Sequence, residues 1–339
     1  MIKPEDCEFH PRDPTDRTWT ETTFLPFGVP EEGIFGNAYV LARPNLGICT
    51  SSIIVTRGFC RQPYEIDFCD PQVHLPCPPK FSSYTLENGL KVESLNGVRD
   101  YRLTYENALG ACSFELTFKG LHQPFDPHDP NENPLVAMTT AATHDKRLGD
   151  AWGTVQKGAS WTNGHFEVKG HITGELELRG KRYKVDCYDG MDHSWGPRKE
   201  HGTRSVSWIS VNFGEAFAMH LAVPMNIRNG EVTYDPVRFG FIVEHGQVYG
   251  VTAAEVEAAR VDMLAMSNRI KVTDIRGKTF EFFGYAVGGH PWYNFNPCHV
   301  CFQALFRYTW GDRVGYGEFG DIFGLDYLSE AMSRSGRHR

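Results

Sequence analysis

A chain of 339 residues predicts two domains or one large all-β unit, and it is long enough to bury a sizeable core. Hydrophobic residues make up 41% of it and charged residues 22%, as in an ordinary soluble globular protein. The formal net charge is −8 and the one basic run is the terminal RSGRHR. We therefore expect no binding to nucleic acid or to an anionic membrane.

The N-terminal stretch MIKPEDCEFHPRD is polar, and no apolar run approaches the roughly 18 residues that span a membrane. This pattern predicts neither a signal peptide nor a membrane span. The nine cysteines are odd in number and irregularly spaced, which favours reduced thiols and a cytoplasmic location.

Short strand patterns dominate the first half of the chain. In CSFELTFKG, Phe114, Leu116 and Phe118 alternate with polar residues, which is the period of a half-buried strand. Asn88-Gly89 separates two further runs and predicts a hairpin turn.

A proline-rich segment from His122 to Pro134 predicts a loop between the two halves. The MTTAATHDKRLGDAW stretch that follows favours a short helix or a connector. We place the domain boundary just after it, which gives domains at 1–155 and 156–339.

The second half returns to strand patterns, with hairpin turns predicted at Gly180, at Gly214-Glu215 and between Glu244 and Gln247. The clearest helix pattern runs from Thr252, an N-cap residue, to Leu264, with Glu at the capping-box position. Aromatic residues reach 13% of the chain, which favours strands over helices. The predicted fold class is mostly β, in two halves closed as sandwiches or barrels.

Two motifs are excluded as cofactor or metal sites. GYGEFG, from Gly315 to Gly320, fits a dinucleotide-binding pattern but stands too near the end of the chain to open the required fold. NPCHVC holds Cys298 and Cys301, yet a zinc site needs a second pair at suitable spacing. We predict no metal and no cofactor. A hydrolase with a hidden nucleophile stays open as an alternative.

The segment YKVDCYDGMDHSWGPR holds most of the candidate chemistry. As a strand it places Met191, His193 and Trp195 on one apolar face, together with Asp189. Tyr188, Asp192 and Ser194 take the other face, unless a bend at Gly190 or Gly196 brings Asp192 into the same cavity. A purely structural reading, in which Asp192 ties down a loop and His193 is a satisfied core histidine, fits the pattern as well.

A longer stretch, VKGHITGELELRGKRYKVDCYDGMDHSWGPR, resembles a lipocalin-like superfamily. Its members include carotenoid 1,2-hydratases (hydroxyneurosporene synthases) and lipocalin-like pericyclases. The shared residues are Gly170, Gly174, Asp192, His193, Trp195 and Gly196. The stretch TWTETTFLPFGVPEEGIFGNAYVLARPN also resembles two-domain bacterial proteins of this type. Outside these two stretches the match is weak.

This resemblance implies two calycin-like β-barrels or half-barrels packed together, with few short helices and a ligand cavity lined by aromatic side chains. It also implies an enzyme without a redox cofactor that hydrates, cyclises or isomerises an apolar substrate. We expect a terpenoid, a steroid or a lignin-type aromatic.

The acid–base residues follow from the same chemistry. Protonation of an alkene needs a strong acid, and burial can keep an aspartic acid protonated near neutral pH. We expect Asp192, or Asp189, as the acid and His193 as an orienting partner or as the base for water. His220, on a face of small alanines, and Glu318 are further catalytic candidates. The expected substrate-binding side chains are Trp195, Trp208, Tyr188 and Met191.

The alternative function is a non-catalytic lipocalin-type protein that binds a lipophilic small molecule. Titratable groups on an inward face favour an enzyme, whereas a carrier needs a mostly apolar lining. Exposed strand edges also make a homodimer an expectation.

Overall fold

The computed structural model describes residues 1–139, 163–198, 201–202 and 205–334. The chain divides into two compact units, each built on an antiparallel sheet. The first unit comprises Met1–Arg57, Glu65–Asp126 and the segment that ends at Arg198. The second unit comprises Gly58–Tyr64, the segment that begins at Pro127, and the chain beyond Arg198.

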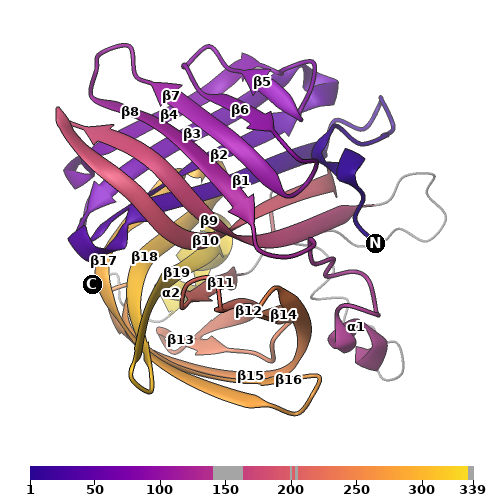
Figure 1. The fold of residues 1–339 in the computed structure, drawn as a ribbon, viewed down its shortest axis with the longest axis vertical. Coiled ribbons are helices and arrows are strands. Elements are labelled where there is room, and N and C mark those ends of the chain that lie inside the picture. Colours follow the sequence, from indigo (N-terminus) through magenta and orange to yellow (C-terminus); the bar gives the residue numbers. More distant parts are fainter. Residues whose placement is uncertain (140–162, 199–200, 203–204, 335–339) are drawn as a thin grey trace. The chain divides into compact units, whose positions relative to one another are not determined.

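The first unit contains a ten-stranded sheet in the order β4-β3-β2-β1-β10-β9-β8-β7-β6-β5 (Figure 1). Its strands are β1 (Trp19–Val29), β2 (Ile34–Arg43), β3 (Ile48–Arg57), β4 (Phe68–Pro76), β5 (Ser83–Thr85), β6 (Lys91–Ser94), β7 (Asp100–Glu106), β8 (Cys112–Gly120), β9 (Gly164–Leu178) and β10 (Lys181–Pro197). β1 pairs with β10, and β8 pairs with β9. The long β9–β10 hairpin therefore lies in the middle of the sheet and not at an edge.

One face of this sheet carries the hydrophobic core of the first unit, and we call it the core face. Phe166, Val168 and Ile172 of β9 are buried in it, as are Val185 and Met191 of β10. These residues stand at alternate positions, since successive side chains of a strand point to opposite faces. The intervening residues of β9 and β10 occupy what we call the opposite face.

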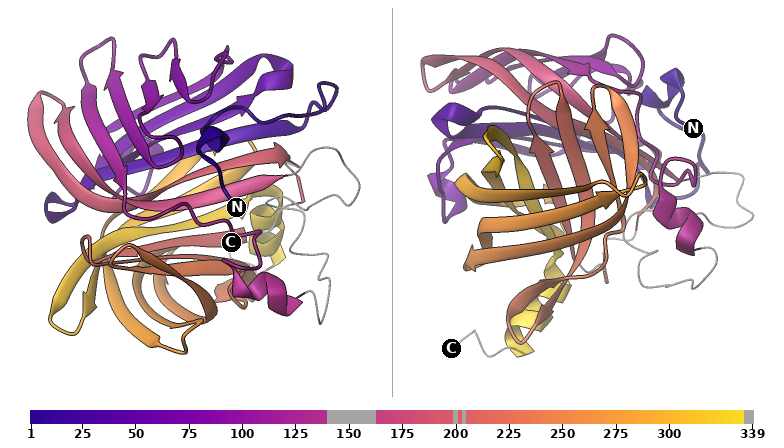
Figure 2. Two further views of the ribbon diagram at one scale, coloured as in Figure 1. Left: turned by 45° about the vertical axis from the view of Figure 1, so that its right-hand side comes forward. Right: turned by 60° about the horizontal axis from the view of Figure 1, so that its bottom comes forward.

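The second unit contains a nine-stranded sheet in the order β11-β19-β18-β17-β16-β15-β14-β12-β13. Figure 2 shows these strands, coloured from salmon to yellow, from two further sides. Its strands are β11 (Ser205–Asn212), β12 (Phe217–Arg228), β13 (Glu231–Tyr234), β14 (Phe239–Glu244), β15 (Gln247–Val261), β16 (Leu264–Asp274), β17 (Thr279–Asn296), β18 (His299–Trp310) and β19 (Arg313–Gly324). A further pairing between β11 and β12 closes all of these strands except β13 into a barrel. The predicted fold class, of calycin-like barrels or half-barrels, is confirmed.

Helices are few and short, as expected. The α-helices are α1 (Pro134–Thr139) and α2 (Leu325–Arg334), and the 3-10 helices are η1 (Pro4–Cys7), η2 (Pro30–Glu32), η3 (Pro44–Leu46) and η4 (Pro63–Glu65). Among the described residues, no helix is long and apolar enough to cross a membrane. All nine cysteines are free thiols.

The predicted hairpins are present, and the predicted helix is not. Turns at Gly89, Gly180, Gly214 and Gly246 adopt positive φ and join successive strands. The segment expected to be a helix from Thr252 to Leu264 instead forms the end of β15 and the start of β16. Its side chains alternate, with Ala254, Val256 and Ala258 packed against the barrel core and the intervening glutamates exposed. The alternation of apolar and polar residues therefore gives a strand here, although Thr252 and Glu255 match a helix-capping pattern.

The division of the chain also differs from the expected one. The predicted boundary, between residues 155 and 156, and most of the stretch expected to be a helix or connector lie outside the described residues. The β9–β10 hairpin pairs with strands of the first unit on both sides. The motif from Asp192 to Gly196 is therefore part of the first unit, and not of the C-terminal domain that the sequence predicts for it.

Candidate functional site

Strand β10 divides the motif between two environments. His193 lies opposite Thr23 of β1 and Phe166 of β9, on the core face. Asp192 is paired with Phe24 of β1 and Glu167 of β9, and its side chain is on the opposite face. The strand does not bend enough to join the two side chains, so the expected pairing of Asp192 with His193 in one cavity is absent.

On the opposite face, Asp192 lies in a group that we call the acid cluster, made of His165, Glu167 and Asp192. The ligand-type atoms of these three side chains all lie within 4.8 Å of one another. His165 Nε2 is 2.8 Å from Glu167 Oε1, and both residues are buried. Glu167 is also fixed through its backbone, which exchanges two hydrogen bonds with Phe125.

The acid cluster holds its carboxyl groups in an environment that disfavours charge. Burial raises the pKa of Glu167 well above its ordinary value; the Lys169 ammonium opposes this effect and Asp189 adds to it. Asp192 is half-buried, and its partial removal from solvent, together with the Glu167 carboxyl, raises its pKa to about 7 against the opposing influence of His165 and Arg198. Two carboxyl groups this close together do not both ionise readily, so the pair favours retention of a proton.

A row of hydroxyl groups continues the acid cluster across β1 and β2. The hydroxyl oxygens of Thr22 and Ser194 lie 2.7 Å apart, and Arg198 donates from Nη2 to Ser194 Oγ at 2.6 Å. Tyr39 is buried, which raises its pKa, while Arg198 and Asp192 act on it in opposite directions. This face therefore offers carboxyl groups of raised pKa beside hydrogen-bond donors and a guanidinium.

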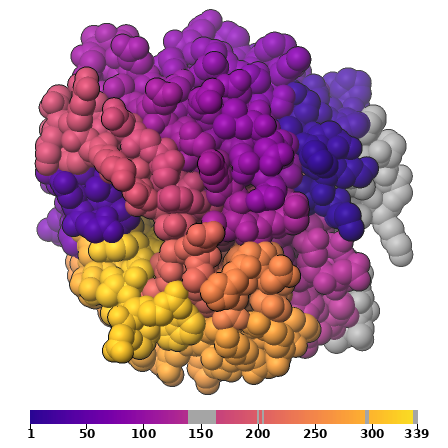
Figure 3. Space-filling view, in the orientation of Figure 1, coloured from indigo at the N-terminus to yellow at the C-terminus, as the bar shows by residue number. Residues whose placement is uncertain are grey.

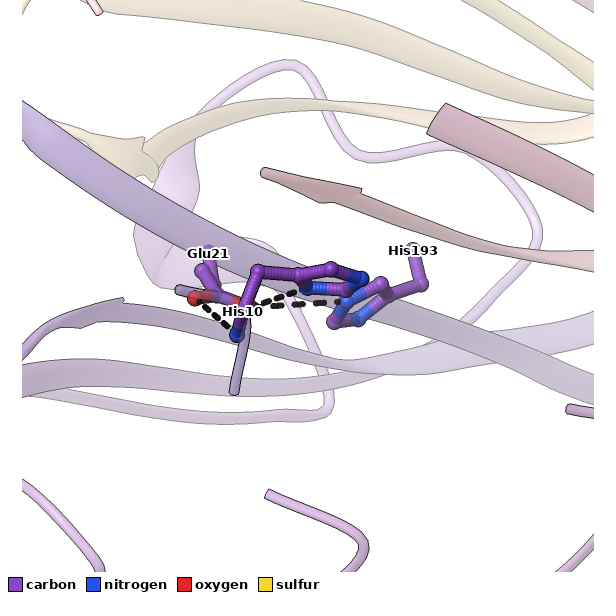
Figure 4. A group of neighbouring side chains, drawn as sticks. All are labelled: His10, Glu21 and His193. Atoms are coloured by element: carbon purple, nitrogen blue, oxygen red, sulfur yellow. Dashed lines mark hydrogen bonds and ion pairs between the residues drawn. The ribbon is translucent and has the colours of Figure 1, made fainter. Parts of the chain in front are cut away.

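On the core face, His193 belongs to a second group, which we call the His–Glu–His cluster: His10, Glu21 and His193 (Figure 4). His10 Nδ1 lies 3.0 Å from Glu21 Oε2, and His193 Nε2 lies 3.7 Å from the same oxygen. The Trp195 indole stacks on the His10 ring at 3.6 Å between centroids. His10 comes from the N-terminal segment, which lies at the surface and is indigo in Figure 3.

Hydrogen bonds keep Glu21 ionised in spite of its burial. Its Oε1 accepts from the Trp19 indole N–H at 3.0 Å and from the His10 backbone N–H at 2.9 Å. Burial alone would raise the pKa of Glu21, but the His10 hydrogen bond and the nearby His193 outweigh it and lower the pKa to about 2. Burial lowers the pKa of His193, and the Glu21 carboxylate opposes that shift. The cluster is therefore a carboxylate beside a buried imidazole, in contrast to the carboxyl groups of raised pKa on the opposite face.

Three other predicted residues of β10 lie outside both clusters. Asp189 Oδ1 accepts the Gly190 amide at 2.9 Å and lies 3.9 Å from Lys169 Nζ, so it is engaged by a cation. Tyr188 stacks on His171 at 4.4 Å between ring centroids. Met191 is fully buried among core side chains, which makes it a packing residue.

The remaining predicted residues belong to the second unit. Trp208 of β11 and His220 of β12 contact each other edge to face at 4.9 Å. Two phenylalanines of β14, Phe239 and Phe241, flank the His220 ring. Glu318 of β19 accepts a hydrogen bond from Gln303 at 2.7 Å. None of these residues belongs to the acid cluster.

Sequence reasoning missed four residues of the two clusters. His165 and Glu167 alternate with Phe166 and Val168 in HFEVKG, so an alternating pattern that puts ionisable groups on one face of a buried strand could have identified them. Glu21 is likewise an acid within a buried strand. Nothing in the sequence pattern pairs His10 with it.

A family model described as "Domain of unknown function (DUF7064)" matches residues 3–322. A comparison with curated proteins finds no match.

Several solved structures share the fold. An AttH-like protein, NE1406 of Nitrosomonas europaea, is 10% identical at a TM-score of 0.59, over 96% of this chain and 97% of that one. Kievitone hydratase of Nectria haematococca is 10% identical at a TM-score of 0.51, over 91% and 89%. CghA, solved with Sch210972, is 11% identical at a TM-score of 0.51, over 91% and 89%. These likenesses confirm the fold that the resemblance implied.

Proposed function

We propose that this chain, which belongs to the DUF7064 family, is a non-redox lyase or isomerase that applies acid–base chemistry to an apolar or aromatic small molecule. The observation that carries this proposal is the acid cluster, in which two carboxyl groups and an imidazole lie within 4.8 Å of one another on one face of the first sheet. Titratable groups with strongly shifted pKa values cluster at functional sites.

The Glu167–Asp192 pair is the proposed proton donor. Because two adjacent carboxyl groups share a proton rather than ionise together, the pair retains an acidic proton at neutral pH. In a hydration, the pair gives this proton to one carbon of a double bond, and water adds its oxygen to the other carbon. The proton that water loses returns to the carboxylate, so the pair is regenerated without a redox step.

His165 and the hydroxyl row take supporting roles. The imidazole that orients the acid or relays its proton is His165, whose Nε2 lies 2.8 Å from Glu167 Oε1, and not His193 as expected from the sequence. Tyr39, Ser194 and Arg198 are suited to hold a carbonyl or hydroxyl oxygen of the substrate.

Kievitone hydratase shares the fold, which supports hydration as one candidate reaction within this class. The proposed substrate is a terpenoid, a steroid or a lignin-type aromatic, in keeping with the 13% aromatic content of the chain. A non-catalytic carrier is the alternative, but a carrier has no need of buried carboxylic acids.

The test is a panel of such compounds incubated with the protein in ¹⁸O-labelled water and analysed by mass spectrometry. We expect a product that has gained or lost one water, or an isomer with altered retention. Glu167→Gln and Asp192→Asn should each lower kcat by about 10²–10⁴-fold, the usual contribution of a general acid.

The matched control is Asp186→Asn. Asp186 stands on the same face of β10 as Asp192 and also pairs with a histidine, His171, at 2.7 Å, but this pair is exposed to solvent. Its removal should leave turnover unchanged. Ligand retained without conversion would indicate the carrier, and full turnover in Glu167→Gln and Asp192→Asn would refute the assigned acid.

A further inference from the structure

The His–Glu–His cluster on the core face has no part in the proposed reaction, since it lies across β10 from the acid cluster. It brings together two imidazoles and one carboxylate from three separate segments of the chain. We propose that His10, Glu21 and His193 bind one divalent transition-metal ion of the zinc class. This inference does not depend on the proposed function, because neither site uses a residue of the other.

The distances between the ligand atoms suit such an ion. Two nitrogens surround one carboxylate oxygen: His10 Nδ1 is 3.0 Å and His193 Nε2 is 3.7 Å from Glu21 Oε2. A four-coordinate zinc ion with bonds of about 2.0–2.2 Å places neighbouring ligand atoms about 3.3–3.5 Å apart. The two observed separations bracket that value, so small side-chain movements would complete the geometry (Figure 4).

The hydrogen bonding of the cluster leaves a position for a cation. Glu21 Oε1 already accepts two N–H groups, which directs Oε2 toward the two imidazoles. The His193 side chain is only 2% exposed, and the acceptor that faces its Nε2, Glu21 Oε2, lies 3.7 Å away, too far for a well-formed hydrogen bond. A buried polar atom left in this way is costly, and a metal ion bonded to Nε2 would remove the cost.

The surroundings resemble the second shell of a metal site. Metal-binding imidazoles usually present their other nitrogen to a carboxylate, and His10 Nε2 faces Asp6 Oδ1 at 3.5 Å. The Trp19 indole and the His10 amide orient the Glu21 carboxylate. Aromatic rings restrict movement of the imidazoles: Trp195 stacks on His10, and Phe81 and Phe166 lie 5.3 and 5.4 Å from His193.

The ligand types select the class of metal. Neutral imidazole nitrogens with one carboxylate suit zinc and its transition-metal neighbours, whereas Mg²⁺ and Ca²⁺ prefer all-oxygen sites. Three protein ligands leave at least one coordination position for water. A bound ion would fasten the N-terminal segment, through His10, onto β1 and β10.

The test uses the full-length chain with a tag that does not bind metals. After chelator treatment and dialysis, Zn²⁺ is added back and bound metal is counted by plasma mass spectrometry, while Co²⁺ binding is followed by visible absorption. We expect about one ion per chain, with a Co²⁺ spectrum typical of nitrogen and oxygen ligands. The melting temperature of the apo-protein should rise when Zn²⁺ is added, because the ion binds the folded chain.

Variants separate this site from the rest of the protein. His10→Ala, in the surface segment, and His193→Ala should each abolish stoichiometric binding and the melting-temperature shift. Asp6→Asn should weaken binding by roughly 10–100-fold, as removal of an outer-shell partner does.

The matched controls are His165→Ala, from the acid cluster, and His171→Ala, from the exposed pair, and both should keep one ion per chain. Failure of the wild-type chain to bind Zn²⁺ or Co²⁺ would overturn the proposal. So would binding that survives the combined His10→Ala and His193→Ala changes, or binding that is lost with His165→Ala.

Discussion

Asp192 and His193 are neighbours in the chain but lie on opposite faces of the sheet, because successive side chains of a strand alternate. Asp192 joins Glu167 and His165, and His193 joins Glu21 and His10. The same alternation places Ser194 beside Thr22 and Trp195 against His10. A single five-residue motif therefore supplies two sites of different chemistry, one with neutral acids and one with a carboxylate and imidazoles.

Glu167 allows a test of this electrostatic picture through stability. Burial raises its pKa in the folded state, so the folded chain binds the proton more tightly than the unfolded chain does. Its stabilising contribution is complete below the unfolded pKa and is lost as the pH rises through the folded one. Glu167→Gln removes this dependence.

The variant should therefore gain melting temperature relative to wild type as the pH is raised from 5 to 9. Thermal unfolding of both proteins across that range measures the difference. A difference that stays constant with pH, or that grows toward acid pH, would contradict a raised pKa at Glu167.

At the scale of elements, the β9–β10 hairpin positions both clusters, and its glycines allow close packing. A Cβ built on Gly170 of β9 would lie 2.2 Å from the ring of Phe118 on β8. Gly170 is one of the residues that carry the resemblance to the lipocalin-like superfamily, and the structure gives a steric reason for a glycine at this position.

Gly170→Ala should therefore lower the free energy of unfolding by about 1–3 kcal/mol, the usual cost of overpacking. Phe118→Leu introduced into the same chain should recover part of that loss, because it removes the atoms that the new methyl group meets. The free energies of unfolding in urea of wild type, the two single variants and the double variant form a double-mutant cycle. Purely additive losses would show that the ring contact is not the cause.

Sequence patterns predicted the parts of this element that depend on local periodicity. The faces of β10 follow from its alternation of apolar and polar residues, and the turn follows from Gly180. In the segment from Thr252 to Leu264, Thr252 and Glu255 match the start of a helix, which is why the sequence predicts one. The structure follows a second pattern, in which Glu255 and Glu257 alternate with apolar residues as in a strand.

Local sequence patterns do not predict contacts between residues that are distant in the sequence. Whether Asp192 meets Glu167 depends on the register between β9 and β10, and whether His193 meets His10 depends on how the N-terminal segment crosses the sheet. The assignment of the hairpin to the first unit has the same origin, because it rests on the pairing of β10 with β1.

At the scale of the whole molecule, the central claim is that the Glu167–Asp192 carboxyl pair in the first unit retains a proton at neutral pH and serves as the acid of a non-redox reaction. Infrared spectroscopy tests this claim without knowledge of the substrate, since the carbonyl stretch of a protonated carboxylic acid is separate from the carboxylate bands. We would record difference spectra at pH 7 between wild type and Glu167→Gln, with Asp186→Asn as the control.

We expect a protonated carboxylic acid band in wild type and in Asp186→Asn that is lost in Glu167→Gln. A wild-type spectrum without such a band at pH 7, or a band that Glu167→Gln leaves intact, would contradict the account.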